Sequence, residues 1–152
     1  MWLMNMKIIQ IMVMVLLIFT AIIDIKKKEI PFLLIGIGAG LAGISVAYGF
    51  VHGAADVETA IALFPGVVLV LISLVTRGEV GLGDGLMFLC IGPVYGLEQT
   101  IAGLLIALFI SSLFSIGILA LKKGNRKTKL PFIPFLSAGM GVALICANYL
   151  VI

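Results

Sequence analysis

Two aspartates at the edges of apolar segments are the residues of this sequence best placed to do chemistry together. Asp24 ends the first apolar run, and Asp84 begins the fourth, 60 residues later. A carboxylate is costly at membrane depth and normally faces the protein interior or a water-filled cavity. Two carboxyl groups about 3 Å apart share one proton, so that one takes a proton from water while the other donates to a carbonyl oxygen. This is the chemistry by which aspartic proteases hydrolyse an amide.

The second aspartate lies among glycines. Gly81, Gly83 and Gly85 surround Asp84, and glycine permits conformations and close backbone approaches that other residues do not. We therefore expect these glycines to let an extended peptide reach the carboxylate. Considered alone, each aspartate has a plainer interpretation, because Asp24 could pair with the lysines that follow it and Asp84 could cap the helix that it begins.

The composition indicates a membrane protein. Hydrophobic residues make up 62% of the 152 residues and charged residues 11%, which leaves too few polar side chains to cover a water-soluble domain. Since a span needs about 20 mostly apolar residues, the length allows roughly six. We predict an all-α, polytopic membrane protein that forms a single transmembrane domain, residues 1–152. Its spans are expected at residues 4–23, 31–50, 58–76, 84–96, 99–121 and 131–151.

Prolines and glycines modify this pattern. Pro93 in the short fourth span predicts a tilted or broken helix, and Pro65 predicts a kink in the third. Pro31 falls in the first turn of the second span, where proline is well tolerated. Five glycines are expected at close helix–helix contacts. They are Gly36, Gly40, Gly43, Gly139 and Gly141.

The basic residues predict the orientation. Nine of the ten lie in breaks that alternate to one side of the membrane, and the opposite breaks, 51–57 and 97–98, contain none. The nine are Lys26, Lys27, Lys28, Arg77, Lys122, Lys123, Arg126, Lys127 and Lys129. The positive-inside rule therefore puts these breaks in the cytoplasm and both termini outside the cytoplasm. The first span is expected to be a retained helix, because its lysines follow the apolar run and no signal-peptidase-like site precedes Asp24.

Four short motifs, taken together, resemble the prepilin peptidase family, a branch of the GxGD intramembrane aspartic proteases that includes the type IV leader peptidases. They are Gly81-Leu82-Gly83-Asp84, Asp24 with the basic loop that ends in Ile30-Pro31, Ile91-Gly92, and Pro131-Phe132-Ile133-Pro134-Phe135. The likeness covers nearly the whole chain. The sequence departs from the family pattern at Leu86, where many members have lysine, and at Phe32, where many have asparagine or aspartate.

The resemblance implies an aspartic endopeptidase that removes the leaders of type IV prepilins or pseudopilins at the cytoplasmic face. Asp24 and Asp84 would be the catalytic pair, and the three loop glycines and Pro31 would shape the site. No cofactor or metal is expected, since Cys90 and Cys146 lack metal-ligand spacing. Larger relatives carry an amino-terminal cysteine domain and also N-methylate the new terminus; this compact form is expected to be without that domain, which leaves methylation open.

The same resemblance implies the partners and the location. The partners would be prepilin or pseudopilin helices and membrane lipids, with no nucleic acid, and the oligomeric state is not indicated. The protein would cross the cell membrane of a prokaryote several times, with its site on the cytoplasmic side. Glu29 and Glu79 lie on that side and could attract a basic leader, although ordinary solvated loop acids are the plainer interpretation.

Other functions fit the same two aspartates. An archaeal-type preflagellin peptidase is the nearest alternative. In a different class, a small proton-coupled transporter would use Asp24 and Asp84 as relay groups. A presenilin-like protease shares Gly-x-Gly-Asp, but that branch has tyrosine where this chain has Ile23, and it has a Pro-Ala-Leu motif that this sequence lacks.

Overall fold

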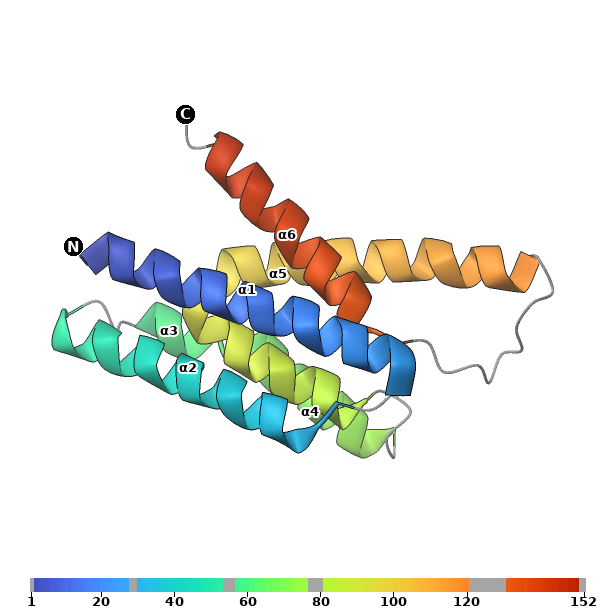
Figure 1. Cartoon of the computed structure of the whole chain (residues 1–152), viewed down its shortest axis with the longest axis horizontal. Helices are drawn as coiled ribbons and strands as arrows, with labels where there is room; N and C mark the ends of the chain where they lie inside the picture. The colour runs from blue at the N-terminus through green and yellow to red at the C-terminus, as the bar shows by residue number, and fades with distance from the viewer. Residues whose placement is uncertain (1, 28–29, 54–56, 77–80, 121–130, 151–152) are drawn as a thin grey trace.

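The computed structural model describes residues 2–27, 30–53, 57–76, 81–120 and 131–150, and these ranges contain helices and no strand. Figure 1 shows the arrangement of the helices. They are α1 (Trp2–Lys27), α2 (Phe32–Val51), α3 (Val57–Ile61), α4 (Phe64–Val75), α5 (Leu82–Ala120) and α6 (Ile133–Leu150). The predicted all-α class is thereby confirmed for the described part of the chain.

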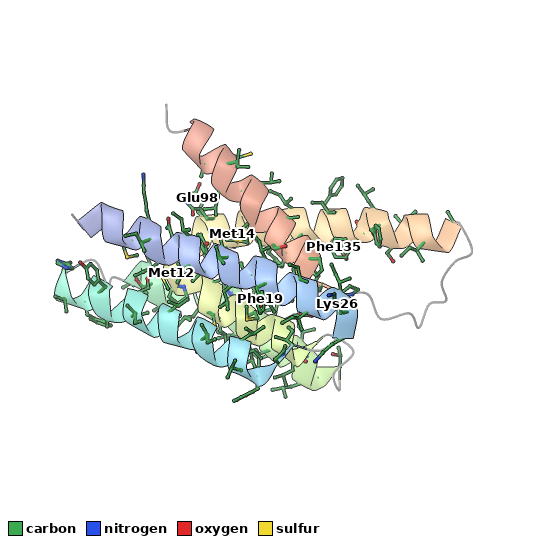
Figure 2. The ribbon with its side chains drawn as sticks, in the orientation of Figure 1. Met12, Met14, Phe19, Lys26, Glu98 and Phe135 are labelled. Carbon is green, nitrogen blue, oxygen red and sulfur yellow. The ribbon has the colours of Figure 1, made fainter. Side chains whose placement is uncertain are left out.

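Four helical stretches are long and apolar enough to cross a membrane. They are Met6–Lys27, Phe32–Val51, Val57–Val75 and Leu82–Ile118, and a shorter apolar stretch covers Ile133–Ala147. Large apolar side chains point outward from them; Met12 is 50% exposed and Phe19 is 54% exposed (Figure 2). Such surfaces suit lipid, where a helix satisfies its own backbone groups. The count of six spans and the side on which the termini lie stay predictions.

The third predicted span is divided. Helix α3 ends at Ile61, and α4 begins at Phe64 with Pro65 in its first turn. Proline fits there because its missing N–H would have no partner within the helix. The expected irregularity at Pro65 is thus a break between two helices, with the proline beginning the second one.

Helix α5 consists of two arms that meet at Gly96. This residue has φ 81° and ψ 168°, a conformation outside the helical region that glycine adopts without strain. Figure 1 shows that the chain reverses direction there, so that residues 82–95 and residues 97–120 run in opposite senses. We call them the first and second arms of α5. They correspond to the fourth and fifth predicted spans, and Pro93 lies in the last turn of the first arm.

Side chains donate to carbonyl groups around this kink. The hydrogen bonds are Ser45 Oγ to the Pro93 oxygen (3.2 Å), Gln10 Nε2 to the Val94 oxygen (3.2 Å) and Thr100 Oγ1 to the Gly96 oxygen (2.6 Å). The Tyr95 hydroxyl donates to the Gln10 carbonyl oxygen at 2.5 Å. In an apolar surrounding, backbone carbonyls released by a break need such partners. We call the seven residues of these bonds the kink cluster.

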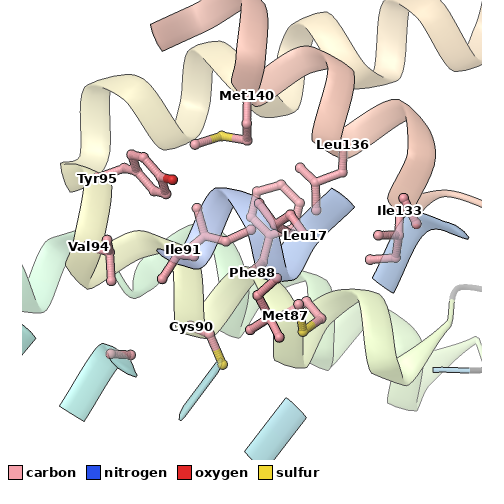
Figure 3. Packing of buried hydrophobic residues seen from close by; sticks show 14 of the residues in the cluster. Leu17, Met87, Phe88, Cys90, Ile91, Val94, Tyr95, Ile133, Leu136 and Met140 are labelled. Atoms are coloured by element: carbon pink, nitrogen blue, oxygen red, sulfur yellow. The ribbon is translucent and has the colours of Figure 1, made fainter. Parts of the chain in front are cut away.

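The core lies between the first arm of α5, α1 and α6. Figure 3 shows its large buried side chains, which interdigitate from these three helices. Among them are Leu17, Met87, Phe88, Ile91, Ile133, Leu136 and Met140. Gly139 of α6 packs directly against Gly103 and Ala107 of α5, as expected for a small residue at a close contact. The packing of α6 on α5 brings the start of α6 to the end of α1.

The expected glycine contacts of α2 were wrong. A Cβ atom added at Gly36, Gly40 or Gly43 would have no neighbour within 4 Å. Gly38 makes the close contact instead, since a Cβ there would lie 3.3 Å from Cys90 of α5. Because α2 is apolar around its whole circumference, the sequence did not indicate which stripe of glycines faces the other helices.

Candidate active site

The fold brings the two aspartates to the same end of the bundle. Asp24 lies in the last turn of α1, and Asp84 lies in the first turn of α5. Their carboxyl groups are close enough for the charge of Asp24 to act on Asp84. Two acids that are far apart in sequence are therefore neighbours, in a protein with few charged residues to spare.

Asp24 is buried and hydrogen-bonded to the last helix. Only 5% of the residue is exposed, and its Oδ2 accepts a hydrogen bond from the backbone N–H of Ile133 at 3.3 Å. Ile133 begins α6, where the first N–H groups have no partner within the helix and the helix dipole favours a negative charge. The next residue, Pro134, has no N–H to offer. The start of α6 thus supplies one backbone donor to a carboxyl group on α1.

Asp84 lies against the glycine that precedes the helix. Its backbone N–H donates to the Gly81 oxygen at 3.0 Å. A Cβ atom added at Gly81 would lie 2.7 Å from Asp84 Oδ2, which is closer than real contacts allow. Any other residue at position 81 would therefore displace the carboxyl group. Asp84 itself is partly exposed, more so than Asp24.

The other two loop glycines pack against protein. A Cβ at Gly85 would lie 2.9 Å from the backbone nitrogen of Val70, so this residue holds α5 close to α4. A Cβ at Gly83 would lie 2.9 Å from the end of the Ile30 side chain. Since Gly85 is buried, a substrate peptide would not reach its backbone. These two glycines let the first turn of α5 approach its neighbours closely, and their role in shaping a site stays a prediction.

Pro31 connects this packing to the second helix. Its carbonyl oxygen accepts the Leu34 N–H at 3.0 Å, at the start of α2, and its neighbour Ile30 is the residue that Gly83 contacts. The Ile30-Pro31 segment therefore lies beside the first turn of α5. Glu29 and Glu79, which could attract a basic leader, are outside the described residues, so their role stays a prediction.

The remaining acids of the described ranges lie elsewhere. Glu58 and Glu98 are exposed and line an open hollow of about 810 Å³ between α3 and the kink of α5. Neither Asp24 nor Asp84 lines that hollow. In the ranges that the structure describes, no group of three or more His, Cys, Asp and Glu residues is arranged to hold a metal ion.

Comparison with known families adds a separate observation. A model of the type IV leader peptidase family matches residues 11–121, which contain Asp24, the glycine motif and Asp84. This chain belongs to the type IV leader peptidase family. The resemblance drawn from its motifs is confirmed. The comparison with curated proteins and the comparison with solved structures each found no match.

In this leader peptidase, one contact of the site was missed by sequence reasoning. The Pro131–Phe135 segment was recognised as a motif, but no role was given to it, and it lies beyond the residues that the family model matches. The structure brings the N–H of Ile133 to Asp24. The available signal was a proline-rich helix start on the same predicted side of the membrane as the carboxyl group of Asp24.

Proposed function

We propose that this leader peptidase is an aspartic endopeptidase that cleaves the leaders of type IV prepilins or prepilin-like proteins at the cytoplasmic face of the membrane. Asp24 and Asp84 are the catalytic pair in this proposal. The observation that carries it is that these two carboxyl groups, from the end of α1 and the start of α5, lie near enough for the charge of one to act on the other, within the residues that match the family. Paired carboxyl groups at membrane depth are otherwise costly to keep.

Such a pair hydrolyses a peptide bond with one shared proton. The oxygen of a water bonds to the peptide carbonyl carbon while the ionised carboxyl takes a water proton and the protonated carboxyl gives its own to the carbonyl oxygen. The C–N bond of the resulting gem-diol then breaks. The nitrogen takes the proton held by the first carboxyl, and a gem-diol hydroxyl returns one to the second. The products are a carboxylic acid and an amine, and the pair again holds one proton.

The cytoplasmic side is supported by the charges next to the pair. Lys26 and Lys27 follow Asp24 in the last turn of α1, and both are exposed. Basic residues at the end of a span favour the cytoplasmic side. A prepilin leader is short and basic and is followed by an apolar helix. Its cleaved bond would therefore lie at the boundary between water and hydrocarbon, which is the depth at which α1 ends.

The test is cleavage of a prepilin by the purified protein in lipid nanodiscs, compared with Asp24→Asn and Asp84→Asn. Asparagine keeps the size of the side chain and can still accept a hydrogen bond, but it can neither take up nor give the proton. Loss of an acid–base group costs about 10²–10⁴-fold in rate. We expect each variant to lose cleavage by at least this factor while its helical content is unchanged. Full cleavage by either variant would contradict the assignment.

Matched controls show whether the loss of cleavage is specific to the two aspartates or follows from the removal of any carboxylate. Glu98→Gln removes a carboxylate that is exposed at the other end of the molecule, and it should cleave at the wild-type rate. A preflagellin offered in parallel distinguishes the archaeal-type alternative by its faster cleavage. If both aspartate variants cleave normally but abolish proton-driven uptake of a solute into vesicles, the transporter interpretation replaces the peptidase one.

A further inference from the structure

The two carboxyl groups of the pair have unequal surroundings. Asp24 is 5% exposed and accepts the Ile133 N–H at 3.3 Å. Asp84 is more exposed than Asp24, and the hydrogen bond that the structure gives it near its carboxyl group is made by its backbone, whose N–H donates to the Gly81 oxygen at 3.0 Å. A pair that shares one proton is therefore asymmetric before any substrate binds.

This asymmetry has a chemical consequence. A hydrogen bond from an N–H group stabilises the charged form of a carboxyl group more than the neutral form, and it is stronger when the acceptor is ionised. The N–H of Ile133 is also at the start of an 18-residue helix, whose dipole favours a negative charge at that end. When only one of the two groups can be ionised, this donor decides which one keeps the charge.

We propose that the backbone N–H of Ile133 is a positioning group that holds Asp24 as the ionised member of the pair. Asp24 is then the base that takes the proton of the attacking water, and Asp84 carries the shared proton and gives it to the carbonyl oxygen. The C–N bond breaks as the nitrogen takes the proton back from Asp24, and a gem-diol hydroxyl re-protonates Asp84. This assignment of roles rests on the proposed peptidase function.

Among the residues that the structure describes, few other charges lie near this donor. The charge of Asp84 on α5 repels that of Asp24, whereas Lys26 and Lys27 follow Asp24 on α1 and are exposed, so that water and salt screen them. Residues 32–38 of α2, 70–76 of α4 and 133–140 of α6 contain no titratable side chain. In the described part of the chain, the donor to the Asp24 carboxyl group is the neutral N–H at the start of α6.

The experiment compares Ile133→Pro with Ile133→Ala. Both substitutions remove a side chain that is completely buried, so both cost stability, but only proline also removes the N–H. Proline is favoured at the first position of a helix. A third protein carries the α-hydroxy analogue of isoleucine at position 133. Its backbone ester lacks the N–H but keeps the side chain, which covers the case in which the proline variant does not fold.

The first measurement is the pH dependence of cleavage. Loss of the N–H should move the acidic limb of the rate profile to higher pH by about one unit, because a hydrogen bond to a charged group is worth roughly that much. On that limb, the proline and ester proteins should be about tenfold slower than the alanine variant at the same pH. Ile133→Ala should lower the amount of folded enzyme but keep the wild-type position of the limb.

The second measurement does not require cleavage. Infrared spectra of protein labelled with ¹³C-aspartate report the protonated carboxyl band, and subtraction of the Asp24→Asn spectrum identifies the contribution of Asp24. We expect Asp24 to become protonated at higher pH in the proline and ester proteins than in Ile133→Ala. If the proline, ester and alanine proteins have equal infrared titrations and equal acidic limbs, the inference is overturned. The proposed peptidase function still stands in that case, provided that the wild type cleaves prepilin. If the wild type cleaves no prepilin, the proposed function fails, and the infrared titration still decides whether Ile133 holds the charge of Asp24.

Discussion

The kink cluster and the aspartate pair lie at opposite ends of the first arm of α5, and both bury polar groups in an apolar molecule. At the kink, neutral side chains meet neutral backbone groups, as when Gln10 donates to Val94 and accepts from Tyr95 through its own carbonyl. At the aspartate end, two ionisable groups act on each other, and one backbone N–H from Ile133 contacts Asp24.

On the proposed function, the difference separates buried polar groups that serve structure from buried polar groups that serve chemistry. A satisfied neutral network stabilises the one arrangement of helices that satisfies it. Two acids that lie near each other cost stability and can gain or lose a proton, which is the property that a general acid and base require. Substitutions at the kink should therefore change stability, and substitutions at the pair should change activity.

The largest expected effect is at the pair, and it should leave stability intact. Asp84→Asn should reduce cleavage by about 10²–10⁴-fold. Because it removes the repulsion with Asp24, the variant should unfold at a temperature equal to or above that of the wild type. Thermal unfolding followed by circular dichroism in detergent, beside the cleavage assay, tests both halves. A clear loss of stability would mean that Asp84 is a structural residue like those of the kink.

The next effect concerns Gly81, which contacts the Asp84 carboxyl group. Gly81→Ala should displace that carboxyl, and misplacement of a reacting group by about 1 Å costs up to about 10²-fold in rate. The measurement is kcat for prepilin cleavage, with KM expected to change little. The matched control is Gly36→Ala, since a Cβ at Gly36 meets nothing within 4 Å. Equal activity of the two variants would show that Gly81 does not position Asp84.

A substitution at the kink should lower stability and leave activity unchanged, the reverse of the effect expected at the aspartate pair. Gly96→Ala places a Cβ on a backbone with φ 81° and ψ 168°, a region that costs a non-glycine residue about 1–3 kcal/mol. The midpoint of unfolding in a sodium dodecyl sulfate titration should fall, while cleavage per folded molecule stays at the wild-type level. Lost activity in a fully folded Gly96→Ala protein would contradict the assignment of the kink to stability and of the aspartate pair to activity.

The smallest effect is expected from a single hydrogen bond of the kink cluster. Tyr95→Phe removes the donor to the Gln10 carbonyl and keeps the ring in the core, so it should cost about 0.5–1.5 kcal/mol of stability. The same detergent titration measures it. A double-mutant cycle with Gln10→Leu should show that the two changes are not additive, because their hydrogen bonds share Gln10. Additive costs would mean that the two bonds are independent.

Several features could be predicted from the sequence because they depend on local composition. The apolar runs predicted helices. The break predicted at residues 97–98 lies next to Gly96, where the structure shows that the chain reverses direction. The charge pattern predicted that Asp24 and Asp84 share one side of the membrane, and the glycine motif led to the family. Hydropathy and charge act on each segment separately, so they can be read without knowing which helices touch.

Only the tertiary structure decided which faces meet. The stripe of Gly36, Gly40 and Gly43 was expected at a contact, but Gly38 makes it, and Gly85 packs on Val70 although it was expected to admit a peptide. Helices that are apolar on every side carry no hydrophobic stripe to indicate their partner. The donor to Asp24 could not be predicted from the sequence either, because every residue except proline carries a backbone N–H. The sequence by itself predicted that this membrane protein holds two acids at one depth, and the packing of α6 determined which of them receives the N–H of Ile133.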